Sequence, residues 1–229
     1  MGERVSGTAG ANEARSSLRE EIRDALLARI LDGTLGPGDR LVEMHVAREF
    51  RTSQAPVREA LRELETMGYV ATATYRGTRV REIPRTEMRD AFRVRALLER
   101  EAVRTGTETG SVDVAALEAA VAGLEKAAAA GDVNAFVRHD EAFHRTLVAG
   151  GGNPVLARHW DLLLVSTRIR ALIRTGIIDI HETGNEHRPI LEAVARGNSE
   201  VAGRLVHEHI DELADRMDTE ARAQAGEQS

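Results

Sequence analysis

A carboxylate and an imidazole stand four residues apart in the segment RHDEAFHRTL, which ends at Leu147. In a helix, Asp140 and His144 share one face with Phe136, Phe143 and Leu147, and that apolar face is expected to pack against a core. A buried carboxylate without a partner costs several kcal/mol, so both groups need a partner inside the protein. That partner can be an arginine in a structural ion pair, or it can be a metal ion.

Two further histidines lie on apolar faces of expected helices. His187 is followed at helical spacing by the apolar residues of HRPILEAV, and His209 lies among those of RLVHEHIDEL. Each group alone is more often a satisfied core residue, but four groups turned inward from three helices favour a common ligand. Three imidazoles and one carboxylate suit a divalent ion such as Zn²⁺, Ni²⁺, Mn²⁺ or Fe²⁺. The sequence therefore predicts one metal site formed by Asp140, His144, His187 and His209.

These candidate ligands lie in a half of the chain that shows only helical periodicity. From Thr86 onward, breaks that contain glycine or asparagine separate the helical segments. The expected helices span residues 86–106, 113–130, 132–149, 153–175, 182–196 and 198–222. We therefore predict an all-α helical bundle over residues 84–222 and a short tail at 223–229. The remaining histidines are expected at the surface or in the scaffold: His45, His139, His159, His181 and His207.

The first part of the chain has a different pattern. Residues 1–15 are polar and aperiodic and are expected to form a disordered tail, after which the capping box SLRE begins a helix at Ser17. A short helix in VEMHVAREF is followed by a third helix in QAPVREALRELETM, capped by Thr52 or Ser53. The alternating segment YVATATYRGTRVREI is typical of a β-hairpin. Three helices and a hairpin within residues 16–83 indicate a winged helix-turn-helix domain in a mainly α protein.

The third helix carries polar side chains that could read DNA. Its apolar stripe, from Val57 to Met67, leaves Gln54, Arg58 and Arg62 on a separate, exposed face. Arginine donates to guanine or phosphate in the major groove, and glutamine can pair with adenine. An arginine at the hairpin tip, in the sequence YRG, could reach a minor groove or the DNA backbone. The alternative is that these arginines form an ordinary solvated surface.

Composition narrows the class of protein. The net charge of −6 lies in residues 84–229, since basic and acidic residues balance in the first 83 residues, so a nucleic-acid partner is not excluded. No apolar run approaches the roughly 18 residues of a membrane span, and no apolar signal segment follows the first residues. The absence of cysteine excludes disulfides and thiolate metal ligands. We expect a cytoplasmic protein that has no membrane partner.

Over about residues 18–83, the segments LGPGDRLVEMHVAREF, APVREALRELETMGYV and RGTRV resemble the DNA-binding half of the GntR family of bacterial transcription regulators. The resemblance implies DNA contacts at Arg58, Arg76 and Gly77. The chain departs from the family at Gln54, where an arginine is usual, and at Arg51, where a glycine is common. The full predicted interface comprises Arg40, Ser53, Gln54, Arg58, Arg62, Arg76 and Gly77.

The second half is similar to the FCD effector domain of the FadR-type subfamily, in the segments DEAFHRTLVAGGGNP, EHRPILEAV and AGRLVHEHI. In metal-binding members one aspartate and three histidines hold a divalent ion, and these positions fall on Asp140, His144, His187 and His209. The resemblance also implies that a small carboxylate binds the metal. Arg95, in RVRALLE, is the candidate for a second contact to that carboxylate, and an ion pair with Glu99 is the alternative.

Together these observations predict a homodimeric transcription regulator that binds a palindromic DNA operator and responds to a small organic acid. We expect a repressor rather than an enzyme. Two other functions stay open. A metal-dependent enzyme acting on small carboxylic acids could use the same ligands to activate water, although no general base is evident near them. A direct metal sensor would use metal occupancy itself as the signal.

Overall fold

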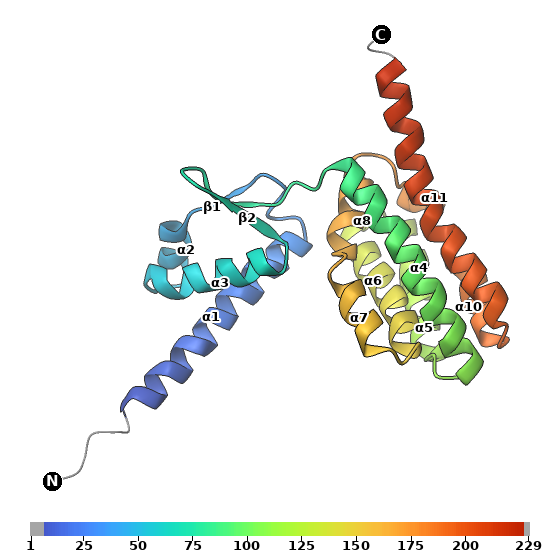
Figure 1. The fold of residues 1–229 in the computed structure, drawn as a ribbon, viewed down its shortest axis with the longest axis horizontal. Helices are drawn as coiled ribbons and strands as arrows, with labels where there is room; N and C mark the ends of the chain where they lie inside the picture. Colours follow the sequence, from blue (N-terminus) through green and yellow to red (C-terminus); the bar gives the residue numbers. More distant parts are fainter. Residues whose placement is uncertain (1–6, 227–229) are drawn as a thin grey trace. The chain divides into compact units, whose positions relative to one another are not determined.

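The computed structural model describes residues 7–226, with side chains described for residues 18–219. Contacts divide the chain after Glu82 into two units, the second of which begins at Ile83 (Figure 1). The boundary expected at Pro84 lies beside this division. Within the tails expected at 1–15 and 223–229, residues 1–6 and 227–229 lie outside the described residues.

The first unit contains three helices and a small antiparallel sheet. Its elements are α1 (Gly7–Leu31), β1 (Arg40–Leu41), α2 (Glu43–Glu49), α3 (Gln54–Thr66), β2 (Val70–Ala73) and β3 (Gly77–Val80). The hairpin β2–β3 pairs Val70 with Val80, as a winged helix-turn-helix requires. The sheet gains β1 on the other edge of β3 and so has three strands rather than two. A strand of two residues is too short to produce an alternating pattern, so the sequence indicates only the hairpin.

Apolar side chains of α1 and α3 form the core of this unit. Ile22 and Leu26 of α1 are buried together with Val57 and Leu64 of α3. The predicted stripe of α3 ends earlier than expected, because Met67 is 37% exposed. Met67 follows the last residue of α3 as its C-cap and therefore no longer lies on the buried face.

Helix α1 begins well before the expected start at Ser17. Its first residue is Gly7, so the prediction of a disordered tail is wrong for residues 7–15. The segment AGANEAR contains three alanines and a glutamate, which favour helix, and no proline interrupts it. At the other end of the chain, the last helix continues to Gly226, beyond the predicted end at residue 222.

All elements described after Ile83 are helices, as predicted for this half. They are α4 (Arg85–Thr109), α5 (Val114–Ala130), α6 (Val133–Gly150), α7 (Pro154–Asp161), α8 (Val165–Arg174), α9 (Ile180–Thr183), α10 (Arg188–Ala195) and α11 (Ser199–Gly226). The long helices α4 and α11 lie side by side (Figure 1). Their apolar faces join those of α5 and α6 in one continuous core.

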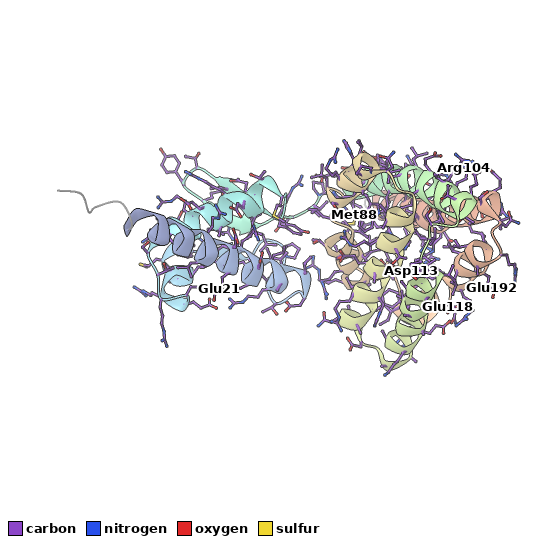
Figure 2. The ribbon with its side chains drawn as sticks, turned by 90° about the horizontal axis from the view of Figure 1, so that it is seen from below. Glu21, Met88, Arg104, Asp113, Glu118 and Glu192 are labelled. Carbon is purple, nitrogen blue, oxygen red and sulfur yellow. The ribbon has the colours of Figure 1, made fainter. Side chains whose placement is uncertain are left out.

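Side chains at the helix ends explain where α5 and α6 begin, and exposed side chains mark their outer faces. Asp113 and Asp132 cap α5 and α6 by accepting hydrogen bonds from Ala116 N and Ala135 N. Figure 2 shows Glu118 of α5 on the outside of this unit, where its side chain is exposed. These caps fix where each helix starts, and the apolar stripe behind the exposed face fixes which side packs inward.

Two predicted helices are interrupted in the structure. The segment expected as one helix over 153–175 forms α7 and α8, because Leu164 adopts the left-handed conformation (φ 51°) and breaks the helical hydrogen bonds. The segment 182–196 forms α9, a turn and α10. Pro189 lies in the first turn of α10, where its missing N–H is tolerated, whereas the longer helix would have placed it in the interior.

Glycines allow α4 and α6 to approach closely. A Cβ added at Gly106 of α4 would lie 2.7 Å from the carbonyl oxygen of Gly150 of α6 and 2.8 Å from Val112 Cγ2. Because the Gly150 oxygen belongs to the backbone of α6, a side chain at Gly106 must push the helices apart.

We expect Gly106→Ala to destabilise the helical unit by about 1–3 kcal/mol through this overpacking. Urea unfolding followed by the fluorescence of Trp160, the single tryptophan of the chain, measures the effect. Gly203→Ala is the matched control, since the nearest atom to an added Cβ in α11 lies 3.4 Å away. Alanine there should be neutral or stabilising by about 0.5–1 kcal/mol. Equal unfolding midpoints for the two variants would contradict the packing argument.

Candidate metal centre

The structure brings all four predicted metal ligands together in the core of the helical unit. Asp140 and His144 lie one turn apart on α6, and His209 lies on α11. One ring nitrogen from each of His144, His187 and His209 lies within 4.8 Å of the other two. Asp140 Oδ1 lies 3.2 Å from His187 Nε2 and 3.8 Å from His144 Nε2. These groups therefore surround one small volume.

His187 reaches this volume from a position that the periodicity did not predict. It precedes α10 as its N-cap and lies in the turn after α9, rather than inside a helix. Its side chain is nevertheless only 1% exposed. The ring packs edge-on against Phe143 and His209, with centroids 4.9 and 4.6 Å away. The turn therefore delivers the imidazole, and the neighbouring rings hold its orientation.

Burial sets the protonation of these groups. Burial lowers the pKa of His187 to about 4, and it lowers the pKa of His144 as well. Burial alone would raise the pKa of Asp140, but the nearby His187 ring, together with His144 and Arg95, holds it well below its usual range. At neutral pH His144 and His187 are thus neutral and the carboxylate of Asp140 is ionised. Metal binding requires this state of the ligands.

Several polar atoms of the cluster have no hydrogen-bond partner. The buried atoms without a partner include Asp140 Oδ2, His144 Nε2 and both ring nitrogens of His187. The 3.2 Å contact between His187 Nε2 and Asp140 Oδ1 lacks the alignment of a hydrogen bond. Buried polar atoms are almost always satisfied in folded proteins, and a cation bound by one atom of each side chain would satisfy part of this set. The donor set of nitrogen and oxygen atoms fits a divalent ion of the zinc, nickel, manganese or iron type.

Two of the histidines contact carboxylates that the sequence analysis did not predict as site residues. Glu99 Oε2 of α4 lies 2.5 Å from His144 Nδ1, and Glu186 Oε2 lies 3.3 Å from His209 Nδ1. Burial alone would raise the pKa of Glu99, but Arg95 and His144 lower it to about 2. In the sequence, Glu186 could have been noticed because it directly precedes His187. Glu99 could have been noticed because it lies on the buried face of α4.

Arg95 forms an ion pair with Glu99, which the sequence analysis gave as the alternative to contact with a carboxylate effector. Its Nε donates to Glu99 Oε1 at 2.7 Å, and the side chain is 2% exposed. Its Nη2 is buried and has no hydrogen-bond partner. One nitrogen is therefore engaged with Glu99 and a second is open to an acceptor, so the two interpretations of Arg95 are compatible.

The candidate DNA-contact residues occupy the expected surface of the first unit. Ser53 is the N-cap of α3, Gln54 is its first residue, and the side chains of Gln54, Arg58 and Arg62 are exposed. Arg76 and Gly77 lie at the tip of the hairpin. Arg40 of β1 lies beside that tip, since its Nε is 3.6 Å from a Cβ added at Gly77. The complete set of candidate DNA-contact residues is Arg40, Ser53, Gln54, Arg58, Arg62, Arg76 and Gly77.

Two features of this surface were not evident from the sequence. Arg58 forms an exposed, two-contact ion pair with Glu43 of α2, with Nη2–Oε2 at 2.8 Å and Nε–Oε1 at 3.1 Å. Such a surface pair contributes little to stability, so DNA can replace it at small cost. Arg51, which stands where the family commonly has glycine, adopts φ 51°. The turn between α2 and α3 thus needs the left-handed conformation that glycine adopts most easily.

Comparison with known proteins agrees with this architecture. The family "Bacterial regulatory proteins, gntR family" matches residues 18–80, and the "FCD domain" family matches residues 90–212. The chain belongs to the GntR family, with an FCD domain. The FCD match covers the helices that carry the metal-ligand candidates, and the GntR match covers the winged helix-turn-helix domain.

Relatives of this GntR protein are transcription regulators. It is 29% identical over 196 residues to the probable D-xylose utilization operon transcriptional repressor of Paenarthrobacter nicotinovorans, covering 86% of this chain and 87% of the relative. It is 29% identical over 210 residues to the HTH-type transcriptional regulator LutR of Bacillus subtilis (81% and 94% covered). The chain is accordingly a DNA-binding transcription regulator of the GntR family with an FCD effector domain.

Solved structures share the fold. A putative GntR transcriptional regulator from Rhodococcus sp. RHA1 superposes with a TM-score of 0.77 at 23% identity, over 88% of this chain and 97% of that structure. McbR/YncC of Escherichia coli gives a TM-score of 0.72 at 21% identity, over 89% and 98%. Within the described residues, the helices of this regulator are too short or too polar to cross a membrane.

We expect His144→Ala to lower the content of bound divalent metal well below that of the parent protein, because it removes one of the candidate nitrogen ligands. Elemental analysis after metal loading and desalting measures this. His207→Ala is the matched control, since His207 lies on α11 two residues before His209 but lines a surface groove with Arg100 and Arg204. Its metal content should equal that of the parent. Equal content in all three proteins would exclude His144 as a ligand.

Proposed function

We propose that this GntR regulator binds a palindromic operator as a homodimer, and that a small carboxylate bound at a divalent ion in the FCD domain controls its operator affinity. The observation that carries the proposal is the buried cluster of Asp140, His144, His187 and His209 with several polar atoms lacking partners. A regulator needs a ligand site separate from its DNA-binding surface. The cluster lies in the helical unit, whereas the candidate DNA contacts lie in the first unit.

The four side chains would hold the ion and leave coordination positions for other ligands. A divalent ion there would supply positive charge and open positions for carboxylate oxygens. Arg95 Nη2 is the candidate donor to a second carboxylate of the effector, because it is buried and lacks a partner. The positive charge of Arg95 also lowers the pKa of Asp140 and of His144, which supports its nearness to the cluster. A small organic acid therefore matches the chemistry of the site.

An effector changes operator affinity only if it binds two arrangements of the protein unequally. The ligand candidates come from α6, α11 and the turn before α10, and Glu99 ties α4 to His144. A carboxylate that bridges the ion and Arg95 would favour one arrangement of these helices. Helix α4 begins at Arg85, shortly after β3 ends at Val80, so its movement would be passed to the DNA-binding unit along the chain.

On the DNA, α3 would enter the major groove and the hairpin would contact the backbone or the minor groove. Two copies of the head would read the two halves of a palindromic operator. We infer repression because an effector that releases a bound regulator gives the simplest response to a metabolite. One of the relatives is a probable transcriptional repressor.

We expect Arg58→Ala to weaken operator binding by about 1–3 kcal/mol, since the exposed guanidinium contacts a base or phosphate. The operator would be selected from random DNA with the parent protein, and affinity measured by gel-shift titration at fixed salt. Arg188→Ala is the control, because Arg188 is an equally exposed arginine that pairs with Glu125 in the helical unit. Unchanged affinity for Arg58→Ala would remove this residue from the interface.

We expect small carboxylates to raise the melting temperature of the metal-loaded protein, with the stabilisation growing as RT ln(1 + [L]/Kd). A panel of mono-, di- and tricarboxylates, tested by thermal shift with Zn²⁺-loaded and chelator-treated protein, identifies the class. Arg95→Lys should keep the charge near Glu99 but lose the second guanidinium nitrogen, and so weaken a dicarboxylate more than a monocarboxylate. Arg100→Lys, an exposed change at the residue that directly follows Glu99 on α4, should change the affinity for neither acid.

The same samples separate this function from its alternatives. If chelator alone changes operator affinity and no carboxylate has an effect, the protein is a direct metal sensor. If a carboxylate is consumed during incubation with the metal-loaded protein, the site is catalytic. Effector control instead requires that an unconsumed carboxylate changes operator affinity and that chelation abolishes the change.

A further inference from the structure

Glu99 is a fully buried carboxylate that contacts three donors from three helices. Arg95 of the same helix and Trp160 of α7 both donate to Oε1, at 2.7 and 2.6 Å. His144 Nδ1 of α6 lies 2.5 Å from the other oxygen, Oε2. Each carboxylate oxygen is thus engaged, and the Arg95 guanidinium and the Trp160 indole can only donate hydrogen bonds to it.

This contact fixes the tautomer of His144. An ion-paired carboxylate can only accept hydrogen bonds, so the imidazole proton must lie on Nδ1. The lone pair of His144 is then on Nε2, which is buried, has no hydrogen-bond partner and lies 3.8 Å from Asp140 Oδ1. Two acceptor atoms therefore face each other across the cluster. A cation between them turns this repulsion into attraction, and the carboxylate behind the ring makes the nitrogen a better ligand.

The other two histidines are held less firmly. His209 Nδ1 has Glu186 at 3.3 Å, but Glu186 is 31% exposed and also lies 3.6 Å from Arg216. Neither nitrogen of His187 has a hydrogen-bond partner within the described residues. Of these three histidines, His144 alone combines full burial with a hydrogen-bonding contact to a carboxylate outside the proposed ligand set. The strength of the centre should therefore depend on Glu99 more than on Glu186.

We propose that Glu99 is the positioning residue of this metal centre, which holds His144 in its metal-binding tautomer and links the ion to the indole of Trp160. The inference rests on the proposed function, because it takes the ion at this cluster as given. Glu99 itself does not bind the metal. It acts through His144, while its other oxygen receives the Trp160 N–H.

Zn²⁺ titration against a competing chelating dye tests this role, with Trp160 emission recorded in parallel. Trp160 is the only tryptophan, so its emission reports the shared carboxylate directly. Glu99→Gln keeps the shape but loses the charge, and Zn²⁺ affinity should fall by about 10–100-fold. The emission change on Zn²⁺ binding should shrink as well. Glu186→Gln is the matched control and should lose less affinity.

Glu99→Gln leaves the Arg95 guanidinium buried without its counter-charge and could prevent folding. A second pair of variants avoids this problem. Arg95→Met alone keeps the Glu99–His144 contact, whereas Arg95→Met with Glu99→Gln removes both charges and the contact. Only the double variant should show the 10–100-fold loss of Zn²⁺ affinity and the reduced Trp160 response.

The outcomes separate this inference from the proposed function. If the parent protein binds neither Zn²⁺, Ni²⁺ nor Mn²⁺ stoichiometrically, the metal site fails and the role of Glu99 fails with it. If the parent binds Zn²⁺ and the double variant binds it as tightly as Arg95→Met, Glu99 is not a positioning residue while the metal site stands. Weaker binding by the double variant, with Glu186→Gln less affected, supports the inference.

Discussion

The helical unit is organised around polar groups that its core excludes from water. Asp140, His144 and His187 are at most 4% exposed, and an apolar core surrounds them. Burial of such groups is costly unless each one is paired. Part of that cost is offset within the protein by Glu99, Arg95 and Glu186. One ring nitrogen from each of His144, His187 and His209 lies near a common point, and several polar atoms of the cluster lack partners, which would favour binding of a cation there.

The positions of the helices follow from the same constraint. Glu99 can reach His144 only if α4 and α6 run close together, and the glycines at 106 and 150 permit that approach. Trp160 of α7 is buried, and its N–H donates to Glu99. The same close packing of helices therefore stabilises the unit and allows the hydrogen bonds that orient the candidate ligands. A change in the occupancy of the site would act on the helices that form it.

The first unit differs, since its candidate DNA-contact residues lie at the surface. The apolar face of α3 packs against α1, which leaves Gln54, Arg58 and Arg62 exposed. Arg58 is held by Glu43 of α2, so the side chain is oriented before DNA arrives. An exposed ion pair contributes little to stability, so the proposed contact of Arg58 with DNA could replace it at small cost. Rigid packing on one face and exchangeable charge on the other make α3 suited to recognition.

Most of the fold that could be predicted from the sequence came from helical and alternating periodicity. The winged helix-turn-helix, the all-α second half and the inward face of Asp140 and His144 follow from residue spacing, because spacing alone decides which side chains share a face. The sequence also identified the four ligand candidates by residue type. It failed where a short local conformation interrupts a pattern, as at Leu164, at the turn before α10, and in the two-residue strand β1.

Tertiary structure alone decided which side chains meet. Glu99 and His144 are 45 positions apart, and Glu99 and Trp160 are 61 positions apart, so no local pattern relates them. The same holds for Glu43 and Arg58, which face each other only because α2 and α3 pack. Periodicity gives the face of one helix, but the distance between two faces depends on how every buried side chain fills the space between them. For that reason the sequence indicated the ligand candidates, whereas only the fold revealed what orients them.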